Sequence, residues 1–168
     1  MPRSFDMSAE YEGDVEQVHR AFGDQNYWLE RLADSGADTA TLDSMKVDGN
    51  GIDVVTTQVL RRDRLPGVVQ QFHPGDLSIV REEVWTPVDG DKATATVTGS
   101  IPGAPVSLKG TAVLTAAGEG GSRLQFNASV EVRIPLVGGK VENFIGGQLV
   151  ELLIAEQRFT TAWIKDNP

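Results

Sequence analysis

Residues 137–164, VGGKVENFIGGQLVELLIAEQRFTTAWI, have a different periodicity from the rest of the chain and require a particular architecture. At about 100° per residue, the largest apolar side chains of this stretch fall within about 60° of Leu152. These side chains are Val141, Ile145, Leu149, Phe159 and Trp163. The stretch therefore predicts an amphipathic helix of about seven turns, roughly 40 Å long, which needs a broad apolar surface to lie on.

Residues 37–135 predict such a surface, because apolar and polar side chains alternate along most of this region. We expect strands over residues 39–47, 52–62, 77–86, 92–101, 106–114 and 123–134. The tetrapeptide Asp48-Gly49-Asn50-Gly51 predicts a tight hairpin between the first two. Residues 65–67 and 72–75, which contain Pro66, His73 and Pro74, interrupt the pattern and predict a longer connection.

The N-terminal region predicts one strand and two short helices. Phe5, Met7, Ala9 and Tyr11 alternate with polar residues, and aspartates at positions 14 and 24 are suited to cap the helices. The predicted order is one strand, two short helices, six antiparallel strands and one long helix, which is an α+β fold. No repeat or linker interrupts residues 1–168, so we expect a single domain.

Composition excludes several classes of function. Fifteen basic and twenty-four acidic residues give a net charge of −9, which argues against binding to nucleic acid or to an anionic bilayer. The chain has no cysteine, so a disulfide framework, a thiolate zinc site and a thiol nucleophile are ruled out. We find no apolar run long enough for a membrane span or a signal sequence, and therefore expect a cytoplasmic protein without integral membrane contact.

Catalytic and cofactor motifs are also missing from the sequence. Its two histidines, His19 and His73, are far apart, and no Gly-x-Ser-x-Gly elbow is present. The glycine-rich segments 48–51 and 118–121 lie between strands rather than before a helix, unlike phosphate-binding loops. We therefore predict no metal and no cofactor.

The order of elements resembles that of the START-like helix-grip superfamily, whose members include lipid-transfer proteins, polyketide cyclases and pollen allergens. Its most specific part is the junction at residues 132–142, VRIPLVGGKVE, where a strand ends near a proline and a glycine pair precedes the helix. An actinobacterial branch of the superfamily carries a similar junction. The resemblance implies a curved antiparallel sheet wrapped around the terminal helix, and a cavity for an apolar small molecule.

Small residues on the inward faces of the predicted strands also favour a cavity, because a filled core would use larger side chains there. The alternative is that Gly99 and Gly110 only let the sheet bend while large residues of the helix fill the space. The predicted ligand contacts are Arg81, Trp85, Ala95, Val97, Gly99, Gly110, Ala112, Phe126, Ala128 and Val130 on strands, and Val141, Ile145, Gln148, Leu149, Leu152, Glu156 and Phe159 on the helix.

Polar residues break two of these apolar faces. Gln148 and Glu156 lie within about 40° of Leu152, so Glu156 is expected to pair with a cation, to reach the cavity, or to extend to solvent at the edge of the stripe. In the strand 77–86 both faces carry charge. If the face with Arg81 and Glu83 is inside, an Arg81–Glu83 or Arg81–Glu156 pair is expected. Solvation of all these charges on a frayed strand is the alternative.

Three functions fit this sequence. The first is binding or transport of a lipid or polyketide-like molecule without catalysis. The second is a cyclase or dehydratase that uses Glu156, Arg81 or Tyr11 for proton transfer. The third is an interaction module whose apolar contact is formed by Val150 and Ile154 on the outer side of the helix. The sequence leaves the oligomeric state open.

Overall fold

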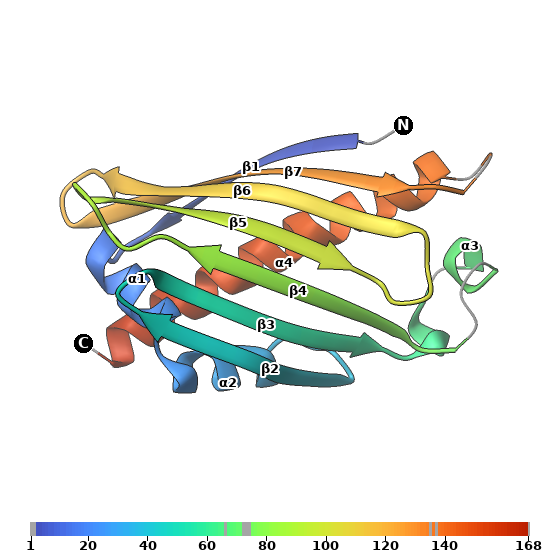
Figure 1. Ribbon diagram of the computed structural model, residues 1–168, viewed down its shortest axis with the longest axis horizontal. Coiled ribbons are helices and arrows are strands. Elements are labelled where there is room, and N and C mark those ends of the chain that lie inside the picture. Colours follow the sequence, from blue (N-terminus) through green and yellow to red (C-terminus); the bar gives the residue numbers. More distant parts are fainter. Residues whose placement is uncertain (1–2, 66, 72–74, 135, 137, 168) are drawn as a thin grey trace.

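The computed structural model describes residues 3–65, 67–71, 75–134, 136 and 138–167. Its strands follow the predicted order: β1 (Arg3–Tyr11), β2 (Thr39–Asp48), β3 (Gly51–Leu60), β4 (Leu77–Trp85), β5 (Lys92–Ser100), β6 (Val106–Ala117) and β7 (Gly121–Val132). The described residues form one antiparallel sheet in the order β1-β7-β6-β5-β4-β3-β2 (Figure 1). The predicted hairpin is present, since Asp48 pairs with Gly51.

The predicted helices form at the expected places, as α1 (Val15–Phe22), α2 (Gln25–Ala33) and α4 (Gly138–Asp166). Asp14 caps α1 by accepting a hydrogen bond from the backbone of Gln17, and Asp24 caps α2 through Asn26. Two further helical turns, η1 (Arg62–Arg64) and α3 (Gly67–Gln70), were not predicted, because segments of three or four residues carry no detectable periodicity. The predictions made for Pro66, His73, Pro74, Pro135 and Val137 fall outside the described residues.

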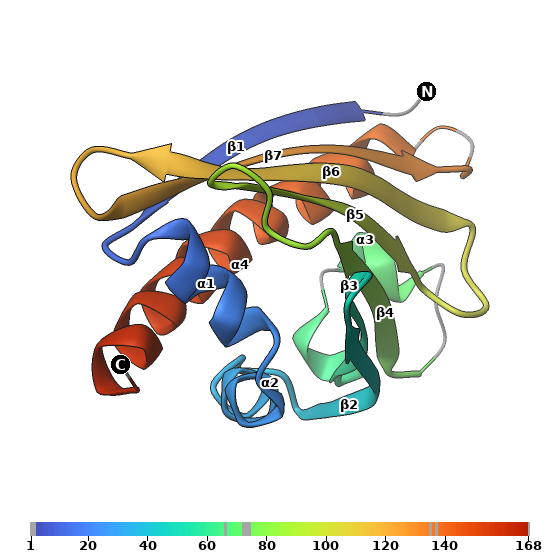
Figure 2. The same cartoon turned by 60° about the vertical axis from the view of Figure 1, so that its left-hand side comes forward.

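The sheet curves around α4, which crosses its concave face, while α1 and α2 cover one end (Figure 2). This arrangement confirms the predicted α+β helix-grip fold. Helix α4 approaches β1 closely at Gly146, where an added Cβ would lie 2.1 Å from the ring of Phe5. A glycine at this position therefore lets the helix rest on the first strand. Among the described residues, no helix combines the length and the hydropathy needed to cross a membrane.

Three groups of packed apolar residues surround the space between α4 and the sheet. The largest contains the aromatic side chains Phe22, Tyr27, Trp28 and Trp85, beneath α1 and α2. A second group, with Leu65, Val69, Leu77 and Ile101, lies at the opposite end of the sheet. The third contains Val130, Val132 and Val141, where the first turns of α4 contact β7. These groups fix both ends of α4 relative to the sheet.

Candidate functional site

A cavity of about 340 Å³ lies between the inner face of the sheet and α4. Its wall follows α4 from Phe144 to Thr160, a length of about 24 Å at 1.5 Å per residue. Gly36, Arg64, Ser100 and Gln148 belong to the wall and are exposed to solvent. The cavity is thus long, narrow and open to the surface.

The wall has an apolar end and a polar end. Leu77, Ile79, Ile101, Val106 and Phe144 form a mainly apolar end beneath the first half of α4, where Gln58, Ser100 and Gln148 also line the wall. The polar end lies beneath the second half of α4 and contains Tyr11, Arg31, Arg81, Glu83, Trp85, Glu156 and Thr160. A molecule aligned with α4 would therefore meet different chemistry at its two ends.

Most of the predicted contact residues lie on this wall: Arg81, Trp85, Val97, Gly99, Ala112, Phe126, Val130, Ile145, Gln148, Leu149, Leu152 and Glu156. Arg81, Glu83 and Trp85 all face inward, which settles the orientation of β4 that the sequence left open.

Three small residues predicted to face the cavity, Ala95, Gly110 and Ala128, lie outside its wall. An added Cβ on Gly110 would lie 2.9 Å from the ring of Phe126, so this ring occupies the space that the glycine leaves. Ala128 is the partner of Gly110 in β7, and Ala95 is the partner of Trp85 in β4. At Gly110 the missing side chain makes room for the ring of Phe126 on the neighbouring strand, whereas the alternative had proposed that large helix residues fill such spaces.

Two predicted residues of α4 also lie outside the wall. Val141 is buried against Val130 and Val132 of β7. Phe159 packs its ring 5.6 Å from that of Tyr27 and belongs to the aromatic core. Both face the interior as the helical periodicity predicted, but other side chains cover them there.

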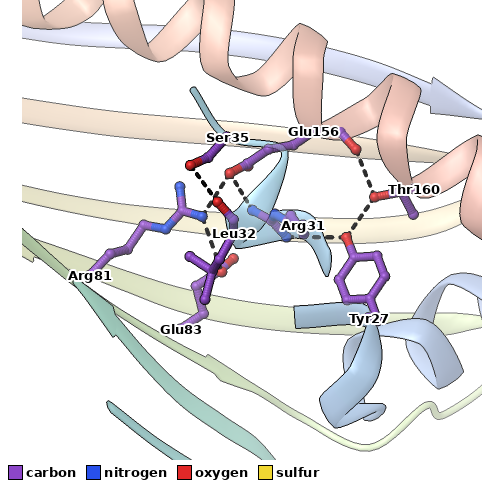
Figure 3. Close-up of polar contacts among 8 residues, drawn as sticks. All are labelled: Tyr27, Arg31, Leu32, Ser35, Arg81, Glu83, Glu156 and Thr160. Atoms are coloured by element: carbon purple, nitrogen blue, oxygen red, sulfur yellow. Dashed lines mark hydrogen bonds and ion pairs between the residues drawn. The ribbon is translucent and has the colours of Figure 1, made fainter. Parts of the chain in front are cut away.

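A cluster of paired charges forms the polar end of the cavity (Figure 3). One carboxylate oxygen of Glu156 lies 2.5 Å from Nη2 of Arg31 and 2.8 Å from Nη2 of Arg81. Glu83 is 3.8 Å from the same nitrogen of Arg81. The cluster therefore joins α2, β4 and α4 around the cavity, and both pairs proposed for Arg81 from the sequence are present.

A chain of hydrogen bonds fixes this cluster to α2 and α4 (Figure 3). Thr160 donates its hydroxyl proton to the carbonyl oxygen of Glu156, over 2.7 Å. Because that proton is already used, the Tyr27 hydroxyl must donate to Thr160, over 2.6 Å. Tyr27 in turn accepts a hydrogen bond from Arg31 at 3.2 Å. The guanidinium of Arg31 also stacks 4.5 Å from the ring of Trp28.

Electrostatic forces keep Arg31, Arg81 and Glu156 ionised. Burial acts to raise the pKa of Glu156, but Arg31 and Arg81 outweigh it and lower this pKa to about 2. For Arg31 burial acts to lower the pKa, yet the nearby Glu156 carboxylate raises it above its ordinary value. Burial raises the pKa of the hydroxyls of Tyr11 and Tyr27, which therefore stay protonated.

Sequence reasoning missed Arg31, although a signal for it exists. Arg31 follows Tyr27 by four residues and Trp28 by three, so it lies on the buried side of α2. Burying an unpaired charge is costly, so a cation in an apolar stripe needs an oppositely charged partner, as the carboxylate of Glu156 does. Among the described residues, no three His, Asp or Glu side chains gather where they could hold a metal ion.

Comparison with known proteins agrees with this architecture. Residues 6–164 match the family model described as "Protein of unknown function (DUF2505)". The uncharacterized protein Rv0481c of Mycobacterium tuberculosis is 55% identical, over 99% of each chain.

Two solved structures have similar folds at low sequence identity. The Zhui aromatase/cyclase from Streptomyces sp. R1128 has a TM-score of 0.63 and 7% identity, covering 98% of this chain and 94% of that one. A START superfamily protein from Mycobacterium smegmatis has a TM-score of 0.56 and 12% identity, covering 98% and 99%. The chain belongs to the DUF2505 family and has the START-like helix-grip fold.

Proposed function

We propose that this chain binds a slender hydrophobic small molecule, a lipid or polyketide-like chain, and carries or senses it without changing it chemically. The observation behind the proposal is the cavity of about 340 Å³, whose wall is mostly apolar. Small-molecule sites are typically clefts of roughly 300–1,000 Å³ with a few polar groups among apolar ones. Because the wall follows about five turns of α4 while the volume is modest, an extended chain fits better than a bulky ring system.

Proton-transfer catalysis in the same cavity is the alternative. A general acid or base works best when its pKa is near the pH of the reaction. The pKa of Glu156 is about 2, which makes its carboxylate a weak base. Burial raises the pKa of Tyr11, which makes its hydroxyl a weak acid. These directions support binding rather than catalysis.

Binding of the uncharged dye Nile red tests the proposal, together with native mass spectrometry of the freshly purified protein. Leu152→Trp should fill part of the cavity and weaken dye binding about tenfold or more, because Leu152 is on the wall. Ile154→Trp is the matched control, since Ile154 lies on the same helix and is 47% exposed. The proposal would be contradicted if the purified protein retained no ligand and if it showed no dye binding that Leu152→Trp weakens.

A further inference from the structure

Two buried N–H groups from the cavity wall have no hydrogen-bond partner among the described residues. They are Nε of Arg81 and Nε1 of Trp85. Trp28 shows the usual arrangement, since its Nε1 donates to the carbonyl oxygen of Phe22 over 2.7 Å. A buried donor without an acceptor destabilises a folded protein, so each exception needs an explanation.

Both N–H groups belong to the polar end of the cavity. Arg81 and Trp85 lie on the inner face of β4 and belong to the wall of the cavity. Trp85 is 2% exposed, and neighbouring side chains cover both nitrogen atoms almost completely. A bound molecule would reach them only if the indole or the guanidinium turned toward the cavity whose wall these two residues form. What these two groups lack is an acceptor.

The charges at this end of the cavity already balance. Arg31 and Arg81 contribute two positive charges, and Glu83 and Glu156 contribute two negative charges. A carboxylate head group would bring an unmatched negative charge beside two carboxylates in a buried site. An ammonium group would meet two guanidinium groups in the same way. The balance thus favours an uncharged head group.

Building on the function proposed above, we infer that the ligand carries an uncharged hydrogen-bond acceptor, the carbonyl oxygen of a ketone, ester or amide. This oxygen accepts a hydrogen bond at the polar end from Nε1 of Trp85. The apolar chain of the ligand extends along α4 toward Phe144. A ligand with two carbonyl groups along its chain satisfies both donors.

Three ligands with the same number of carbon atoms separate these possibilities: undecane, undecanoic acid and methyl nonyl ketone. The indole N–H signals of the full chain report contact directly, because the sequence contains only three tryptophans, Trp28, Trp85 and Trp163. We expect the ketone to move the Trp85 signal downfield, as a new hydrogen bond does, and to leave that of Trp28 in place. The ketone should bind roughly tenfold more tightly than undecane or undecanoate.

Trp85→Phe keeps an aromatic ring but removes the N–H group. It should reduce the affinity for the ketone roughly tenfold and leave that for undecane nearly unchanged. Trp28→Phe is the matched control, because Trp28 lies outside the cavity wall, and it should preserve the preference for the ketone.

Different results would overturn different conclusions. Equal binding of ketone and undecane, tightest binding of the acid, or ketone binding without a shift of the Trp85 signal would overturn the inferred head group and leave the proposed function standing. Binding of none of the three ligands, together with no binding of Nile red, would overturn the proposed function and this inference with it.

Discussion

Replacing Glu156 with glutamine tests whether the charge cluster holds α2, β4 and α4 together. Glu156→Gln preserves the size of the side chain but removes the negative charge that faces Arg31 and Arg81. The two guanidinium groups then repel each other in a buried site. Removal of one partner from a buried ion pair typically costs about 3–5 kcal/mol.

The pKa of Glu156 gives an independent value for the same effect. A fall from the ordinary 4.5 to about 2 corresponds to about 3 kcal/mol of stability at neutral pH. Since the pKa is lower in the folded state, this contribution is fully present above pH 4.5. It is lost as the pH falls through about 2, because the unfolded chain binds the proton first.

Urea unfolding of both proteins from neutral to acid pH measures this contribution. At neutral pH the free energy of unfolding should be about 3 kcal/mol lower for Glu156→Gln than for the unsubstituted chain, and the two should converge as the pH falls from about 5 to about 2. Glu151→Gln is the control, because Glu151 is exposed on the same helix, and it should change stability by less than about 0.5 kcal/mol. A difference below about 1 kcal/mol at neutral pH, or one that does not vary with pH, would refute this account of the cluster.

Three further substitutions test how α4 rests on the sheet, with stability measured by thermal unfolding. Gly146→Ala should destabilise the chain by roughly 1–3 kcal/mol, because the new Cβ would lie 2.1 Å from the Phe5 ring. At Gly147 no atom lies within 4 Å of an added Cβ, so Gly147→Ala should instead stabilise the helix by roughly 0.5–1 kcal/mol. Glu142→Ala should cost roughly 1–3 kcal/mol, since Glu142 is 2% exposed and accepts a hydrogen bond from the backbone of Val132 at 3.0 Å. Equal effects of Gly146→Ala and Gly147→Ala, or an unchanged melting temperature for Glu142→Ala, would contradict these contacts.

The fold could be predicted because its signals are long and local. The amphipathic pattern of α4 extends over many turns, and alternation marks each strand, so neither depends on knowing a distant partner. Glu156 stood out for the same reason, because it interrupts a long stripe. Arg31 was missed because the nine residues of α2 define a stripe less clearly.

The cavity wall was harder to predict because the role of a small residue depends on its neighbours across the sheet. Gly99 belongs to the wall, whereas Gly110 lies under the ring of Phe126. Both glycines alternate with polar residues in the same way, so the flanking sequence does not show which of them faces the cavity. The difference arises from the pairing of β6 with β7, which places Phe126 opposite Ala112 and beside Gly110.

The charge cluster also explains why α4 does not collapse onto the sheet and close the cavity. Protein interiors pack densely, so apolar side chains on both sides of a gap tend to fill it. Arg31, Arg81 and Glu156 would each lose charged hydrogen bonds, at a cost of several kcal/mol, if apolar side chains moved between them. Glu156 thus connects α4 to α2 and to β4 through two arginine side chains. A protein with well-packed apolar residues in place of a buried ion pair is often as stable as the original or more stable. Stability alone therefore gives no reason for the cluster, whereas an open cavity with a polar end does.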